Sequence, residues 1–215
     1  STQHYVRITT AVAGSTGLAM TTQYNSTFTT GTSITPLTNE FGADCTLGSD
    51  TLAQAESVMT STEANLATAR TISGLVVTGI DRFNSFYLQK GNDAIYVDVS
   101  TSGTACGGSG CAGNKATQYG LQVGDEICMT ITRGQSNFSV PTVRDFSAIK
   151  KSGVGSVTQY NVNTSGLPAA ADISRSVTIT GFISQKGTVG SNTDHYLTFN
   201  NSQIVIRDSS STKFT

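Results

Sequence analysis

Apolar residues recur at every second position over much of this 215-residue chain, and this period constrains the fold more than any other feature. Successive residues of a strand face opposite sides of a sheet, so the pattern predicts half-buried β-strands. In residues 126–131, Ile127, Met129 and Ile131 alternate toward one face and leave Cys128 on the other. The predicted strands from Ile72 onward cover residues 72–80, 85–89, 94–99, 126–131 and about 138–143.

Only residues 51–59 are predicted to be helical. Ser49 and Asp50 are the expected N-terminal caps, because their side chains accept hydrogen bonds from the first turn. The residues expected on one helix face are Leu52, Ala55, Val58 and Met59.

Three short sequences recur at a nearly constant spacing. TISGLV at 71–76 matches TITGFI at 178–183 with an offset of 107. YLQ at 87–89 matches YLT at 196–198, and AIYV at 94–97 matches QIVI at 203–206, both with an offset of 109. Either two hairpins share these patterns by chance, or the chain contains a second, similar unit. A second unit gives the division 1–48 for N-terminal strands, 49–160 for a barrel, 162–171 for a linker and 172–215 for the repeat.

The second unit is shorter than the first, because only residues 208–215 follow its third strand. Unpaired strand edges promote association, so we expect other strands to complete the unit. Residues 5–10 resemble 126–131, and residues 17–22 resemble 137–140. As strands, they would complete the second unit of their own chain or that of a neighbouring copy. Pairing with a neighbour creates a head-to-tail interface, which generates a fibre. The residues expected at this interface are Tyr5, Val6, Ile8, Leu18, Met20, Ile204, Val205 and Ile206.

The segments LAQA (52–55), ISGLVV (72–77), FYLQ (86–89), AIYV (94–97) and LQVGDEI (121–127) follow one another in a recognisable order. This order resembles the OB-fold domains attached to secreted bacterial nucleases and other cell-surface proteins, over about residues 51–150. The resemblance implies a small β-barrel and a secreted location. It does not imply nuclease activity, because the sequence shows no constellation of acidic and histidine residues for a metal-dependent nuclease. Lys90 also stands where the family usually has an acidic residue.

We therefore expect a mainly β fold, with an OB-like β-barrel, a second, incomplete OB-like or β-sandwich unit and one short helix. The chain has 13 Lys and Arg against 14 Asp and Glu, for a net charge of -1. This balance excludes a duplex nucleic-acid binder that relies on phosphate neutralisation. The apolar runs are too short for a membrane span.

The composition is also rich in Ser and Thr, which suit outward strand faces and O-glycosylation. The sequence has N-glycosylation motifs at Asn25, Asn137, Asn163 and Asn200.

The chain has four cysteines, an even number with no Cys-x-x-Cys pair. Cys106 and Cys111 enclose a flexible GGSG loop, so we expect them to pair with each other and Cys45 to pair with Cys128. The other two pairings and four reduced thiols stay open at this point. Disulfides, together with a start at Ser1 rather than Met, favour a mature secreted protein.

No residue set predicts catalysis, a metal or a cofactor. His195 and the pair Asp125 and Glu126 are the residues a hydrolase would use, and strand or turn positions explain them equally well. We expect a non-enzymatic, secreted filament subunit whose partners are copies of itself. The alternative is a binding module for oligosaccharide or single-stranded nucleic acid, with a ligand face formed by Tyr87, Tyr96, Arg82 and Lys90.

Overall fold

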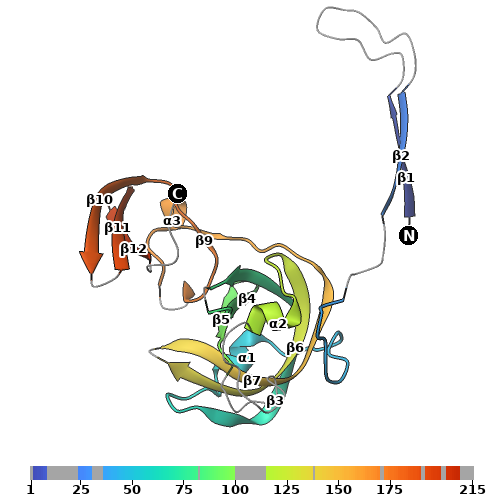
Figure 1. Cartoon of the computed structure of the whole chain (residues 1–215), viewed down its shortest axis with the longest axis horizontal. Coiled ribbons are helices and arrows are strands. Elements are labelled where there is room, and N and C mark those ends of the chain that lie inside the picture. Colours follow the sequence, from blue (N-terminus) through green and yellow to red (C-terminus); the bar gives the residue numbers. More distant parts are fainter. Residues whose placement is uncertain are drawn as a thin grey trace, which may run out of the picture. The chain divides into compact units, whose positions relative to one another are not determined.

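The structure is a computed structural model that describes residues 2–8, 24–30, 36–81, 83–99, 115–137, 139–169, 172–189, 192–199 and 202–208. The chain divides into two compact units, Ser1–Thr35 and Pro36–Thr215. The first unit contains a β-hairpin, and the second contains a barrel, a two-stranded sheet and a three-stranded sheet (Figure 1). Among the described residues, no helix is long and apolar enough to cross a membrane.

Five strands close into the barrel, in the order β3-β4-β5-β7-β6 (Figure 1). Neighbouring strands are antiparallel except β5 and β7, which run parallel. The strands are β3 (Ala64–Ile80), β4 (Phe86–Lys90), β5 (Asp93–Val97), β6 (Asp125–Asn137) and β7 (Val140–Val154). The predicted β-barrel is thereby confirmed, and its last strand extends well beyond the expected residue 143.

The period of two arises because alternate residues of each strand fill the barrel interior. On β6, Ile127, Met129 and Ile131 are fully buried in the main core, as the alternation predicts. On β4 and β5, Leu88 and Ile95 are cross-strand partners, and each is 0% exposed. This apolar interior provides most of the driving force for closing the barrel.

The predicted helix forms as α1 (Leu52–Glu56), so it ends before Val58, which is exposed, and its N-cap is Thr51. The Thr51 hydroxyl accepts from the Gln54 backbone N–H, and the Gln54 side chain accepts from the Thr51 N–H at 2.8 Å. Asp50, one of the two predicted caps, instead accepts from the Thr71 backbone N–H at 2.7 Å and so ties this segment to β3. Two further short helices form, α2 (Lys115–Tyr119) between β5 and β6, and α3 (Val162–Ser165) within the predicted linker.

A disulfide joins Cys45 to Cys128, as expected. The two cysteines form a small buried cluster with Ala148, separate from the main core. Cys128 therefore lies on the outer face of β6, and the segment that carries Cys45 covers it. Isolated bridges from Phe41 to Ile149 and from Ser49 to Ile72 hold this segment on the barrel. Cys106 and Cys111 lie outside the described residues.

Beyond the barrel, β8 (Tyr160–Asn161) pairs in parallel with β9 (Val177–Thr178). Three antiparallel strands follow in the order β10-β11-β12. They are β10 (Phe182–Val189), β11 (Asn192–Phe199) and β12 (Ser202–Asp208).

The hairpin of the first unit pairs β1 (Thr2–Ile8) with β2 (Tyr24–Thr30). The first strand overlaps the predicted segment 5–10. The second predicted segment, 17–22, lies outside the described residues, and β2 follows it in the sequence.

Candidate functional sites

Two tyrosines form an aromatic pair on the outer face of the barrel. Tyr87 on β4 and Tyr96 on β5 are cross-strand partners, with ring centroids 4.8 Å apart. Both are half-buried, and burial raises the pKa of each phenol. The Tyr96 hydroxyl donates to Asp81 at 2.7 Å, which fixes its ring. The pair is a neutral, oriented aromatic surface at physiological pH.

This pair forms part of a surface hollow of about 300 Å³. Its other lining residues are Asp98, Gln135, Val140, Thr142 and Arg144. Arg144 donates to Asp98 at 2.7 Å and to Glu63 at 3.0 Å, so nearby carboxylates already engage its charge. A hollow with an aromatic pair, an amide and compensated charges suits a neutral polar ligand better than a polyanion.

The structure brings together only part of the predicted ligand face. Tyr87 and Tyr96 meet as expected, whereas Arg82 lies outside the described residues. Lys90 is exposed at the end of β4, opposite Asp93, and does not line the hollow. The sequence analysis missed Asp98 and Arg144, because Arg144 reaches the site only through pairing between β5 and the distant strand β7.

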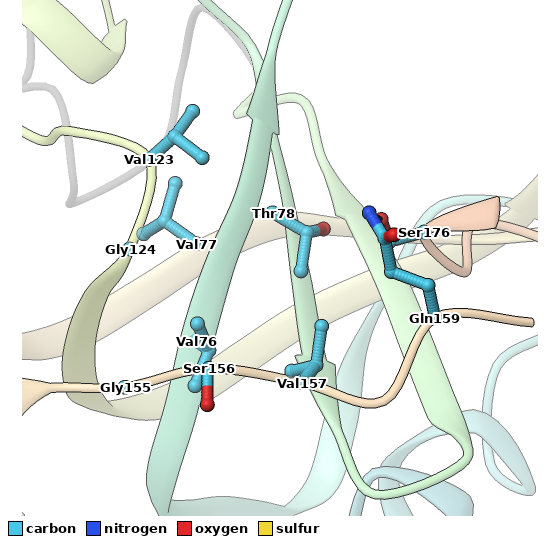
Figure 2. A pocket seen from close by; sticks show the side chains of 10 residues that line it. All are labelled: Val76, Val77, Thr78, Val123, Gly124, Gly155, Ser156, Val157, Gln159 and Ser176. Atoms are coloured by element: carbon cyan, nitrogen blue, oxygen red, sulfur yellow. Dashed lines mark hydrogen bonds between the residues drawn. The ribbon is translucent and has the colours of Figure 1, made fainter. Parts of the chain in front are cut away.

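A second hollow, of about 330 Å³, lies on the outer side of β3 (Figure 2). It forms where the chain after β7 passes over Val76 and Thr78. Its lining residues carry no titratable side chain: they are Val76, Val77, Thr78, Val123, Gly124, Gly155, Ser156, Val157, Gln159 and Ser176. The passing segment is held by Gln89, whose amide donates to the Thr158 carbonyl and accepts from the Ser176 N–H. This hollow therefore marks the attachment of the connecting segment to the barrel.

The three-stranded sheet has two edges without a strand partner among the described residues. There, β10 and β12 each pair with β11 alone. Leu197 and Ile204 are cross-strand partners in this sheet and are partly exposed. Phe182 is 64% exposed and Val205 is 48% exposed. Exposed apolar residues on a sheet with open edges provide a surface for association.

The N-terminal hairpin and β12 carry most of the residues predicted for the subunit interface. The register pairs His4 with Phe28, Val6 with Ser26 and Ile8 with Tyr24. Of the predicted interface residues, Tyr5, Val6 and Ile8 belong to β1, and Ile204, Val205 and Ile206 belong to β12. Leu18 and Met20 lie outside the described residues.

The residues considered for hydrolysis take part in local structural contacts. Asp125 forms an ion pair with Lys151 at 2.6 Å and accepts from the Gln122 N–H at 2.8 Å. Glu126 accepts from the Ser152 hydroxyl, and His195 lies on β11 with 8% exposure. Over the described part of the chain, no cluster of three His, Cys, Asp or Glu residues is placed to hold a metal ion.

The four glycosylation candidates differ in their surroundings. Asn25 belongs to β2 and Asn137 ends β6, whereas Asn200 lies outside the described residues. The Asn163 side chain donates to the Thr180 carbonyl and accepts from the Thr180 N–H, each at 2.6 Å. A glycan on Asn163 would disrupt this contact.

The closed five-stranded barrel, with its helix between the third and fourth strands, is compatible with an OB-like fold. The extra sheet and hairpin are additions to it. Comparison with family models, curated proteins and solved structures finds no match to the chain.

Proposed function

We propose that this protein is a secreted structural subunit of an extracellular filament, assembled by β-strand exchange between copies. One observation carries the proposal: the described part of the chain contains both a three-stranded sheet whose two edges have no strand partner and a two-stranded hairpin in another unit. A two-stranded hairpin alone is only marginally stable in water, and open sheet edges tend to recruit further strands. The hairpin can therefore supply strands to the open sheet edges, and the sheet can supply the partners that stabilise the hairpin.

Strand donation from one copy to the next is a head-to-tail contact. The donating surface and the accepting surface differ, so each subunit can donate at one place and accept at another. Such contacts generate an open filament unless the rotation between copies closes a ring. The separation of the hairpin from the C-terminal sheet along the sequence supports this arrangement.

The composition supports close packing of many copies. Charged residues make up 13% of the chain and the net charge is -1, so like subunits repel one another weakly. The Cys45–Cys128 disulfide supports an oxidising location such as the cell exterior.

Negative-stain imaging and a light-scattering concentration series test the proposal. The full chain is expected to scatter increasingly with concentration and to form filaments, whereas a variant without residues 1–30 stays monomeric. The circular dichroism of the deletion variant should still show a folded β protein, because the barrel belongs to the other unit. A full-length chain that stays strictly monomeric, or filaments that form without residues 1–30, would contradict the proposal.

A second candidate function is oligosaccharide binding by the outer barrel face. The tilted tyrosine pair that lines a hollow of about 300 Å³ favours it, and the carboxylates around Arg144 disfavour single-stranded nucleic acid. Face-on aromatic contact suits a sugar ring, and strands 2 and 3 of OB folds commonly bind such ligands.

Tyr87→Ala and Tyr96→Ala are expected to weaken oligosaccharide binding by about tenfold or more, since tenfold corresponds to only about 1.4 kcal/mol. Isothermal titration against a glycan panel measures the change. Tyr160→Ala is the control, because Tyr160 lies outside the hollow. Equal affinities for all three variants and the wild type, or no binding by the wild type, would eliminate this function.

A further inference from the structure

We infer that the C-terminal sheet of one copy and the N-terminal hairpin of a second copy form a composite barrel with the strand order of the first. In this barrel β12 runs parallel to β2 and β10 runs antiparallel to β1, closing the order β10-β11-β12-β2-β1. The inference rests on the proposed filament function and specifies how its subunits meet.

The C-terminal sheet reproduces the first three strands of the barrel, residue by residue. On β4 and β5 the register pairs Phe86 with Val97, Tyr87 with Tyr96, Leu88 with Ile95 and Gln89 with Ala94. On β11 and β12 it pairs His195 with Ile206, Tyr196 with Val205, Leu197 with Ile204 and Thr198 with Gln203. Every one of these residues lies 109 positions after its counterpart.

The strand β10, which pairs with β11, also repeats a register shift that β3 shows in the barrel. In the barrel, Val76 pairs with Gln89 and Val77 with Leu88, and the register then shifts before Gly79. In the C-terminal sheet, Phe182 pairs with Thr198 and Ile183 with Leu197, and the register then shifts before Gln185. Strand pairing thus places Phe182 in the position of Val76, an offset of 106, one residue less than the sequence match indicates. A bulge at the same place in both supports the interpretation of the sheet as the first three strands of a second five-stranded barrel.

The two strands that the sheet lacks are a hairpin in the first barrel. There β6 and β7 are consecutive and antiparallel, β6 pairs with β3, and β7 pairs with β5 in parallel. The N-terminal unit offers two consecutive antiparallel strands, β1 and β2. Val6 and Ile8 alternate along β1 as Ile127 and Met129 alternate along β6. Tyr5 then corresponds to Glu126, which lies opposite Val76.

Apolar residues of the three-stranded sheet are more exposed than their counterparts in the barrel, as expected for a second barrel that is incomplete among the described residues. Leu88 and Ile95 are 0% exposed where five strands surround them. Their counterparts Leu197 and Ile204 are partly exposed on three strands. Among the described residues, the sheet and the hairpin pair only within themselves. A second copy's hairpin would cover the apolar face and pair both open edges at once.

Disulfide crosslinking within assembled material tests this geometry. Phe182→Cys combined with Tyr5→Cys places the new cysteines on β10 and β1, where directly opposed Cα atoms lie about 4.5–5.5 Å apart. Phe182→Cys combined with Thr27→Cys is the matched control, because Thr27 is the hairpin partner of Tyr5 and lies one strand further away. That extra strand adds about 4.8 Å, beyond the reach of a disulfide. Both pairs are made in a Cys106→Ser/Cys111→Ser background and oxidised after filaments are confirmed by microscopy.

We expect a ladder of covalent oligomers on non-reducing gels for the first pair and none for the control. A ladder from the control alone means that the hairpin docks in the reverse orientation, which would refute the composite barrel. Crosslinked monomer without a ladder would show that the hairpin closes its own chain. Filaments in which neither pair crosslinks would refute the composite barrel and leave the filament function intact, whereas the absence of filaments in the wild type would remove the function itself.

Discussion

Replacing Cys45 and Cys128 with alanine is expected to lower the free energy of unfolding by about 2–5 kcal/mol. The bond joins residues 83 positions apart, so its loss releases a long loop in the unfolded chain. Both cysteines are almost fully buried, and the bond anchors the segment that covers the outer face of β6. Urea unfolding followed by circular dichroism measures the change.

The control for this prediction uses a reductant. The Cys45→Ala/Cys128→Ala variant should unfold at the same urea concentration with and without dithiothreitol. Cys106→Ala/Cys111→Ala should remain sensitive to the reductant, because it retains the bond between Cys45 and Cys128. If the urea midpoint of the wild-type protein is the same with and without the reductant, this disulfide adds nothing to stability.

The matched pair Leu88→Ala and Leu197→Ala should distinguish the closed barrel from the three-stranded sheet. Leu88 is fully buried, so its truncation is expected to cost about 2–5 kcal/mol whether or not the protein is assembled. Leu197 holds the corresponding position in the C-terminal sheet and is partly exposed. Its truncation should cost about 1 kcal/mol or less in the dilute monomer, because less apolar contact is lost.

Assembly should increase the loss of stability caused by Leu197→Ala relative to that caused by Leu88→Ala. In filaments, Leu197→Ala is expected to lower the dissociation temperature clearly, because the proposed donation of the hairpin would bury this position. Calorimetry on dilute and assembled samples gives both values. If Leu197→Ala has the same small effect in both states, no strand covers that face of the sheet, and the proposed strand exchange is wrong.

Some features follow from local sequence alone. The alternation of Ile127, Met129 and Ile131 predicted both the strand and its inward face. The same alternation placed Cys128 outside, which is where the disulfide lies. Local signals were less reliable for caps and connections: Thr51 rather than Ser49 or Asp50 caps α1, and α2 and α3 carry no periodicity long enough to detect. Short helices depend on tertiary contacts more than on propensity.

The sequence by itself determined which residues of the barrel strands face inward, and it indicated a repeat, because both depend on spacing along the chain. Only the tertiary structure decided which strands are neighbours. It brought Arg144 beside Asp98 and Glu63, although they are far apart in sequence, and it showed that one barrel closes while the other sheet keeps open edges among the described residues. The physical reason is that a backbone edge can pair with any strand of suitable register, and local sequence does not specify which one.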